Sequence, residues 1–255
     1  YYELEEGLRS ERDVARSVVQ GFVRGIRPTL GGQRIKIRDY QIDAISHAIA
    51  TNRSLLISPT ASGKSLIIYC LVRYYQMMEL KTLILVPTTS LVEQMYKDFE
   101  DYGWSSGTYC QKIYQGHDRK VVKDVVISTW QSLHRMPRPY FRQFGAVFGD
   151  EAHLFKAKSL TGIMTKLDTC KYRFGLTGTL DGTQTHRLVL EGLFGKAKYV
   201  VTTKELIDNK TLSELSINCI ILKYPDEDRQ TVKEFDYGAE LEYIVTKEER
   251  NLFLC

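Results

Sequence analysis

The chain alternates between short, almost continuous apolar runs and longer segments in which apolar residues recur at helical spacing. The apolar runs lie at residues 54–57, 82–86, 125–128, 146–149 and 174–177. The helical spacing is found at residues 39–50, 65–78 and 90–102. Strands that are apolar along their whole length are buried on both faces, which is typical of a parallel sheet covered by helices. The pattern therefore predicts an α/β fold with a central parallel sheet.

Polar motifs follow these apolar runs directly. They come after Ile57, Val86, Ile127, Phe148 and Leu176. Ligands of open α/β sheets bind outside the carboxyl ends of the strands. We therefore expect the motifs to share one functional edge of the sheet.

A charged segment of helical pattern, residues 1–32, precedes the alternation. It breaks at Pro28, Gly31 and Gly32, and this cluster predicts a linker. Because the chain opens at Tyr1 rather than Met, we expect it to be a piece of a longer protein. The composition, with 43% hydrophobic and 26% charged residues, is ordinary for a globular protein and argues against disorder.

Charge changes this picture only a little. The net charge of +4 is by itself weak evidence for a polyanionic partner. The charges are uneven, however, and residues 226–250 lean acidic. The two basic stretches comprise Arg24, Arg27, Arg34, Lys36 and Arg38, and then Arg135, Arg138, Arg142, Lys156 and Lys158. Each stretch is either a solvated face or a surface for a polyanion.

The cysteines and the lengths of the apolar runs bear on the compartment. The five cysteines, at positions 70, 110, 170, 219 and 255, lack the close spacing of a zinc or redox motif. They predict free thiols in a reducing, cytoplasmic compartment. No run of about 18 apolar residues and no signal peptide is present. We expect Trp104 and Trp130 to fill cores rather than to stack on bases.

The run Ser58–Ser65, with the sequence SPTASGKS, carries the first candidate chemistry. A tight turn between a strand and a helix directs backbone N–H groups toward phosphate oxygens, and the helix N-terminus adds its positive dipole end. Lys64 can reach the β- and γ-phosphates of ATP, and the Ser65 hydroxyl can ligate Mg²⁺. Ser58 stands where the usual pattern has its first glycine. The residues expected to bind nucleotide here are Thr60, Ser62, Gly63, Lys64 and Ser65.

Two adjacent carboxylates, Asp150 and Glu151, end the fourth predicted strand. In a Mg²⁺-dependent ATPase, Asp150 would hold the metal and Glu151 would orient and deprotonate the attacking water. The alternative is an exposed acidic turn before a helix. Together with the upstream loop, the pair predicts a catalytic set of Lys64, Asp150 and Glu151.

The order of these motifs resembles the first motor domain of superfamily-two helicases of the DEAH type. It consists of Gly-Lys-Ser at residues 63–65, Asp-Glu-Ala-His at residues 150–153 and Leu-Thr-Gly-Thr at residues 176–179. Connecting motifs at residues 38–41, 86–94 and 128–131 agree with it. Runs at residues 129–131, 174–176, 193–195 and 224–227 are similar to the recombination helicases of T4-type phages. The resemblance covers roughly residues 33–253.

This resemblance implies a RecA-like P-loop domain over residues 33–215 and a connector, residues 216–255, toward a second RecA-like domain. Gln41 would read the adenine edge, with Arg38 packing nearby. His153, Thr177 and Thr179 would couple the ATP site to movement. The nucleic-acid contacts would come from Thr88, Thr89, Thr129 and Gln131, although such threonines can instead cap helices.

The implied function is ATP-driven, Mg²⁺-dependent translocation on branched DNA such as forks, junctions and R-loops, in recombination and repair. The host cytoplasm is the expected location for a phage protein. Three alternatives stay open: an RNA helicase, because this motor half reads few bases; a binding or annealing module without ATPase activity; and a subunit of a restriction-type translocase. Arginines that complete the ATP site are expected from the second RecA-like domain.

Overall fold

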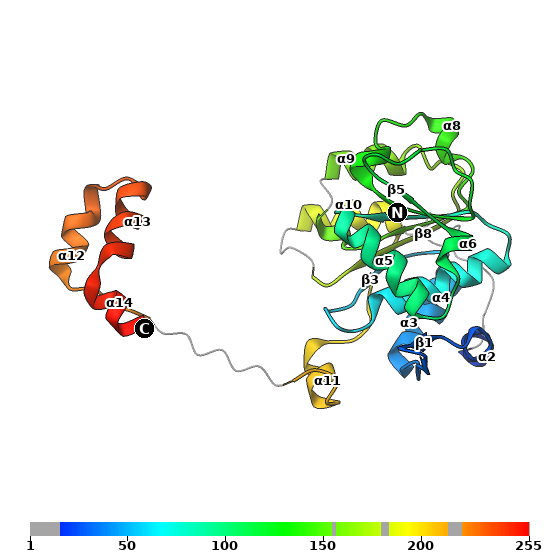
Figure 1. Ribbon diagram of the computed structural model, residues 1–255, viewed down its shortest axis with the longest axis horizontal. Coiled ribbons are helices and arrows are strands. Elements are labelled where there is room, and N and C mark those ends of the chain that lie inside the picture. Colours follow the sequence, from blue (N-terminus) through cyan, green and yellow to red (C-terminus); the bar gives the residue numbers. More distant parts are fainter. Residues whose placement is uncertain (1–15, 155–156, 180–183, 214–220, 255) are drawn as a thin grey trace. The chain divides into compact units, whose positions relative to one another are not determined.

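The structure, a computed structural model, describes residues 16–154, 157–179, 184–213 and 221–254. It divides the chain into two compact units, Tyr1–Ser213 and Glu214–Cys255 (Figure 1). Lys156 of the second basic stretch, Cys219 and Cys255 lie outside the described residues. Every helix in the described part of the chain is too short or too polar to span a bilayer.

The larger unit is built on a seven-stranded sheet in which all described strand pairs are parallel. The strand order is β5-β6-β4-β7-β8-β3-β9. The strands are β3 (Arg53–Ile57), β4 (Thr82–Val86), β5 (Cys110–Ile113), β6 (Val125–Thr129), β7 (Ala146–Gly149), β8 (Tyr172–Thr177) and β9 (Ala197–Tyr199). The predicted α/β fold with a parallel sheet is confirmed. The apolar-run pattern missed β5 and β9, because both are short edge strands with polar residues.

Helices cover both faces of this sheet. One face carries α2 (Arg16–Ile26), α3 (Asp39–Thr51), α4 (Lys64–Met77) and α5 (Thr89–Asp101). The other carries α7 (Trp130–Leu133), α8 (Arg138–Phe141), α9 (Ala157–Met164) and α10 (Gln184–Phe194). The remaining helices of the unit are α6 (Ser106–Tyr109), η1 (Ala152–Leu154) and α11 (Thr203–Asp208).

The interior strand β4 connects the two cores, because successive side chains of a strand point to opposite faces. Ile84 and Val86 pack in the core under α3, α4 and α5. Leu83 and Leu85 pack in the core under α7 to α10. An uninterrupted apolar run is therefore what this position in the sheet requires.

Residues 27–32, for which the Pro/Gly cluster predicts a linker, belong instead to an antiparallel hairpin that ends at Arg34. Its strands are β1 (Thr29–Leu30) and β2 (Gln33–Arg34), and Gly31 and Gly32 supply the positive φ angles of its turn. The hairpin is anchored on the end of α5, since Thr29 N donates to Tyr102 O at 3.1 Å and Thr29 Oγ1 donates to Asp101 O at 3.1 Å. The turn signal was correct, but tertiary hydrogen bonds hold the segment on the domain.

The predictions for the cysteines and tryptophans can be checked in this unit. Cys70, Cys110 and Cys170 are free and buried, and burial raises the pKa of each thiol to about 12. Trp104 is buried against Tyr69 and Phe99, as expected for a core residue. Trp130 is half-buried and packs against the second core.

The smaller unit is helical. It consists of α12 (Asp226–Thr231), η2 (Val232–Glu234), α13 (Tyr237–Thr246) and α14 (Glu248–Leu254). Asp228 connects two of these helices, accepting a hydrogen bond from Tyr243 Oη at 2.7 Å and pairing with Lys247. Leu252 and Phe253 are exposed. The role of residues 216–255 as a connector stays a prediction.

Candidate active site and nucleic-acid interface

The loop between β3 and α4 carries the predicted phosphate-binding motif. Ser58 N donates to Thr177 O at 2.8 Å, which fixes the start of the loop to β8. Ser58 Oγ donates to Ser62 Oγ at 2.6 Å, and Ser62 Oγ donates to Pro59 O at 2.6 Å. Both serines are fully buried. The hydroxyl pair therefore closes the turn from inside, which explains how the loop accepts serine at its first position.

The backbone at the end of this loop is left-handed. Gly63 has a φ of 81° and caps α4 without a side-chain hydrogen bond, so the first turn of α4 is not covered by a cap. Ala61 has a φ of 64°, which costs a non-glycine residue some free energy and is a feature of ligand-binding turns. Thr60 lies exposed at the tip of the loop. This geometry leaves helix N–H groups for phosphate oxygens.

Lys64, the first residue of α4, reaches the end of β7. Its Nζ lies 3.1 Å from Glu151 Oε1, and the lysine side chain is only 11% exposed. Gly178 lies beside this ion pair, and a Cβ at that position would make ordinary van der Waals contact with Lys64 Nζ at 3.7 Å and with Thr60 N at 3.8 Å. The loop, the lysine and the carboxylates predicted from separate motifs therefore meet at one edge of the sheet.

Asp150 is nearly buried, and its Oδ1 has no hydrogen-bond partner among the described residues. Burial, and next the charge of Glu151, raise the pKa of Asp150 to about 6. A buried, unsatisfied carboxylate oxygen beside the loop predicted to bind phosphate fits a hard cation such as Mg²⁺. No three His, Cys, Asp or Glu residues of the described chain form a metal cage. Mg²⁺ commonly binds through one or two carboxylates plus substrate phosphates and water.

Glu151 adopts a left-handed backbone with a φ of 49°, an uncommon conformation for a non-glycine residue. This backbone conformation lets the Glu151 side chain face Lys64, while Asp150, one residue earlier, stays buried at the end of β7. Glu151 Oε2 also lies 3.4 Å from His153 Nδ1. The general-base candidate is therefore placed between the phosphate-binding lysine and the histidine of the motif.

Ser65, the predicted Mg²⁺ ligand of α4, has partners that the motif did not predict. Its Oγ is 2.8 Å from the Tyr102 hydroxyl, and it also donates to the Asp98 carboxylate. Burial raises the pKa of Asp98, and the hydrogen bond from Ser65 opposes that shift. Metal ligation by Ser65 would use a lone pair of Oγ, so the contacts of this hydroxyl would rearrange around the cation. The position of Asp98 and Tyr102 at the end of α5 gave no sequence signal for this contact.

The upstream motif at residues 38–41 lies against the phosphate loop. Gln41 is buried, and its Nε2 donates to Ser62 O at 3.0 Å while its Oε1 accepts from Arg38 N at 3.0 Å. Tyr40 Oη also donates to Ser62 O, at 2.9 Å, and accepts from Arg38 Nη1 at 2.9 Å. The motif therefore supports the loop directly. Reading of an adenine edge by Gln41 and Arg38 stays a prediction.

His153 connects the catalytic turn to the strand β8. Its Nδ1 lies 2.6 Å from Thr177 Oγ1, whose hydroxyl donates to Thr179 O at 2.7 Å. Because a threonine hydroxyl has one proton, Thr177 accepts from His153, and Nδ1 carries the hydrogen. The three residues predicted to couple ATP to movement are thus one hydrogen-bonded chain.

A groove of about 510 Å³ lies at the ends of β4 and β6, and all four predicted nucleic-acid contacts, Thr88, Thr89, Thr129 and Gln131, line it. Thr88 Oγ1 caps α5 by accepting from Leu91 N, and Thr129 Oγ1 bonds Ser132 Oγ. Gln131 Nε2 donates to Pro87 O at 3.1 Å, joining two of the motifs. The capping alternative is therefore correct for Thr88, but it does not remove the residue from the groove.

The third wall of this groove comes from the loop after β5, which sequence reasoning missed. Its lining side chains include Tyr114, His117 and Arg119. Tyr114 Oη donates to Glu93 of α5, and Lys112 pairs with the same carboxylate at 2.7 Å. Lys112 first, and then Tyr114, lower the pKa of Glu93. The only available signal was the short basic run Arg119–Lys120 after Gly116.

Comparison with known proteins agrees with this geometry. Residues 34–182 match the family described as Type III restriction enzyme, res subunit, which is more than half of the chain. The chain belongs to this family, whose motor domain is that of the superfamily-two helicases. The family assignment confirms the resemblance inferred from the motifs.

Two curated relatives narrow the assignment. The present chain is 35% identical, over 99% of its length, to the "ATP-dependent DNA helicase uvsW" of Enterobacteria phage T4. It is 25% identical over 90% of its length to the "DNA 3'-5' translocase XPB2" of Sulfurisphaera tokodaii. It spans 51% and 48% of these two relatives, about half the length of each. It is therefore a UvsW homologue in a family of ATP-dependent DNA helicases and translocases.

Solved structures agree on the fold. The present chain superposes on the crystal structure of the UvsW helicase from bacteriophage T4 with a TM-score of 0.70 and 35% identity. The match covers 75% of the present chain and 70% of the UvsW chain. The present chain also matches the Sulfolobus solfataricus SWI2/SNF2 ATPase core in complex with dsDNA, with a TM-score of 0.53 and 19% identity, covering 63% and 36% of the two chains. The second likeness establishes the RecA-like fold alone.

Proposed function

We propose that this chain binds and hydrolyses ATP at Lys64, Asp150 and Glu151 and uses the energy to move along DNA. The observation that carries the proposal is the meeting of Lys64 Nζ and Glu151 Oε1 at 3.1 Å beside the unsatisfied Oδ1 of Asp150. A structural ion pair alone would not need an adjacent buried carboxylate with a raised pKa. Perturbed carboxylates next to a phosphate-binding loop are typical of a catalytic site.

Each residue of the site has a role that its position supports. The loop residues Thr60, Ser62 and Gly63 surround the phosphates with backbone N–H groups, and Lys64 binds the β- and γ-phosphate oxygens. Asp150 and Ser65 hold Mg²⁺, which neutralises charge that develops on the phosphates. Glu151 accepts the proton of the attacking water. Gln41 and Arg38 recognise the adenine.

Coupling to movement follows from the hydrogen-bonded chain of His153, Thr177 and Thr179. His153 lies near Glu151, and Thr177 lies at the end of β8. A shift of Glu151 away from Lys64 when the lysine binds phosphate would alter the hydrogen bond that His153 donates. This supports a coupling role, because the chain joins the catalytic turn to a strand end that also holds the phosphate loop.

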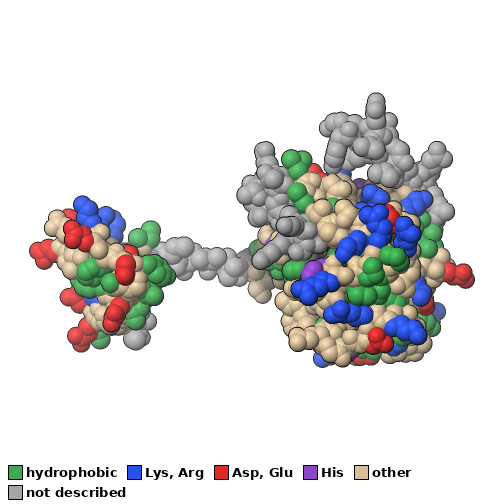
Figure 2. Space-filling model, turned by 90° about the horizontal axis from the view of Figure 1, so that it is seen from above, with side chains coloured by type: hydrophobic (Ala, Val, Ile, Leu, Met, Phe, Trp, Pro, Cys, Tyr) green, Lys and Arg blue, Asp and Glu red, His purple; other side chains and the backbone are tan. Residues whose placement is uncertain are grey.

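The track for nucleic acid is the groove lined by Thr88, Thr89, Thr129 and Gln131, with Arg119 on its third wall. Thr and Gln side chains are common donors to phosphate oxygens, and such contacts position a protein on nucleic acid without reading its sequence. Lys and Arg side chains also gather on one face of the larger unit (Figure 2), which supports a polyanionic partner. The name of the T4 relative favours DNA over RNA.

The finer substrate and setting are proposed from the same kinship. Branched DNA, namely forks, junctions and R-loops that contain RNA, is the substrate, and recombination and repair are the processes. The site of action is the cytoplasm, that of the host for a phage protein. A second RecA-like domain supplies arginines to the γ-phosphate, as the length of the relatives supports.

DNA-stimulated ATP hydrolysis by a protein that includes both this chain and the second RecA-like domain tests the proposal. Turnover should need Mg²⁺ and rise on addition of a forked DNA duplex more than on addition of an RNA duplex of the same sequence and shape. The Lys64→Ala variant should lose at least about a hundredfold in turnover, since the transition-state charge loses its cation. Lys204→Ala, on exposed α11, is the matched control and should match the wild type. Undiminished hydrolysis by Lys64→Ala would refute the assignment of the loop, and a preference for RNA would assign the motor to RNA.

A further inference from the structure

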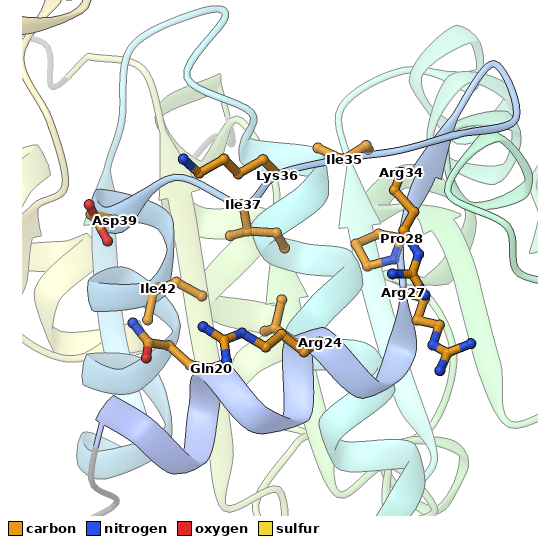
Figure 3. Close-up of a pocket in the computed structure, with 11 residues that line it drawn as sticks. Gln20, Arg24, Arg27, Pro28, Arg34, Ile35, Lys36, Ile37, Asp39 and Ile42 are labelled. Atoms are coloured by element: carbon orange, nitrogen blue, oxygen red, sulfur yellow. The ribbon is translucent and has the colours of Figure 1, made fainter.

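A second cavity, of about 520 Å³, lies between α2 and the segment that leads from the hairpin into α3 (Figure 3). Its lining includes an apolar set from both sides: Val23, Pro28, Ile35, Ile37 and Ile42. This cavity contains none of the residues assigned to ATP or to the groove. It is a separate feature of the larger unit.

Four exposed cations stand around this apolar floor. Arg24 and Arg27 come from α2 and its end, and Arg34 and Lys36 come from the opposite segment. None of the four makes an ion pair or side-chain hydrogen bond with another described residue. Their charges therefore remain uncompensated in the described part of the chain.

The acidic residue of the lining does not neutralise them. Asp39 lines the cavity, but its carboxylate is held by Arg16 at 2.8 Å. Arg16 is also bound to Asp43 at 2.6 Å. Like-charged groups that converge on one cavity repel each other, and an anion relieves that repulsion. The charge pattern thus selects a multiply charged anion.

The position of the cavity favours a nucleic-acid strand as that anion. Helix α5 has Thr88 and Thr89 of the groove at its start, and its end holds Thr29, next to Pro28 of the cavity. With 13 residues, α5 is about 20 Å long, so the two sites are separated by roughly the length of six base pairs. A strand that runs from the groove along α5 would bring phosphates to the cavity over that length.

We propose that this cavity is a second nucleic-acid contact, at which Arg24, Arg27, Arg34 and Lys36 bind phosphodiester groups outside the motor groove. Guanidinium groups bind phosphate oxygens in a bidentate geometry. The apolar floor of the cavity would contact the deoxyribose carbons between the phosphates. The inference rests on the proposed DNA binding but not on ATP hydrolysis. The contact at this cavity adds affinity for DNA without sequence selectivity.

The test is the salt dependence of DNA binding by Arg24→Gln/Arg34→Gln, which removes one cation from each wall. Affinity for a 20-base-pair duplex is measured by fluorescence anisotropy without nucleotide, from about 50 to about 200 mM salt. Loss of two phosphate contacts should reduce the slope of log K against log salt by about 1.8. The charge-preserving Arg24→Lys/Arg34→Lys variant should keep most of the wild-type slope. MgATP affinity should be the same in all three proteins.

Lys204→Gln/Lys210→Gln is the matched control, because it removes two exposed charges that line neither cavity. It should keep the wild-type slope. If Arg24→Gln/Arg34→Gln also keeps that slope while the groove variant Arg119→Gln lowers it, the proposal is overturned and DNA binding at the groove stands. That result is also expected if an acidic polypeptide segment occupies the cavity. Wild-type protein that binds no DNA would instead overturn the proposed function.

Discussion

Lys64 Nζ lies 3.1 Å from Glu151 Oε1, which joins the start of α4 to the end of β7 across the intervening strand β8. The two residues are 87 positions apart, and each belongs to a different motif. The residue predicted to bind phosphate and the general-base candidate are therefore each other's ion-pair partner in this structure. Binding of phosphate by Lys64 would release Glu151 toward the water that it activates.

Glu151→Gln should separate nucleotide binding from chemistry. The amide keeps the size of the side chain and can still lie near Lys64, but it cannot accept the proton. We expect MgATP affinity to remain close to the wild type while turnover falls at least about a hundredfold, the usual scale for loss of a general base. Nucleotide titration and single-turnover hydrolysis measure the two quantities. A parallel loss of binding and hydrolysis would mean that Glu151 acts in the fold rather than in the reaction.

Gly63→Ala should disturb the phosphate loop through Gln41. A Cβ at residue 63 would lie 2.4 Å from Gln41 Nε2, and the φ of +81° disfavours any side chain. Gln41 would have to leave Ser62 O, so we expect a loss of about 1–3 kcal/mol in the free energy of unfolding and weaker MgATP binding. Denaturant unfolding and nucleotide titration measure these effects.

Gly21→Ala is the matched control for this substitution. Gly21 lies within α2 with open space at its Cβ position, so alanine there should stabilise the protein by about 0.5–1 kcal/mol. If Gly63→Ala were as stable and as tight-binding as the wild type, the contact of Gln41 with the loop would not matter for the site.

Arg119→Gln should weaken DNA binding at the groove uniformly across sequences. The residue lines the third wall and is exposed, so the substitution should reduce the slope of log K against log salt by about 0.9, the value for one phosphate contact. Anisotropy with two duplexes of unrelated sequence measures this. A variant that loses affinity for one sequence only would indicate base readout instead.

His47 should make the stability of the larger unit depend on pH. Burial, and then the charge of Lys198, lower the pKa of this histidine of α3. The folded state therefore binds fewer protons than the unfolded state, and stability is lost as pH falls below the unfolded pKa of about 6.5. The melting temperature of His47→Gln should fall less than that of the wild type between about pH 7.5 and about pH 5. Equal falls in the two proteins would assign the acid sensitivity to other groups.

The sequence by itself determined the sheet and the edge at which the residues predicted to be catalytic meet. β4 is apolar from Leu83 to Val86 because it is buried on both faces, and the motifs after β3, β7 and β8 meet because parallel strands end at one edge. Local periodicity and fixed topology carry this information, so Lys64, Asp150 and Glu151 were named correctly as neighbours without coordinates.

Only the tertiary structure decided the remaining features. The partners of Ser65 on α5, the wall formed by Arg119 and the hairpin at Thr29 arise from contacts between segments far apart in the sequence. The cations Arg24 and Arg34 are ten positions apart, and the sequence left a solvated face as an equal alternative. Their convergence on one cavity depends on how α2 packs against α3 and on where the hairpin is anchored. Packing between non-adjacent elements fixes such positions, and no local pattern encodes it.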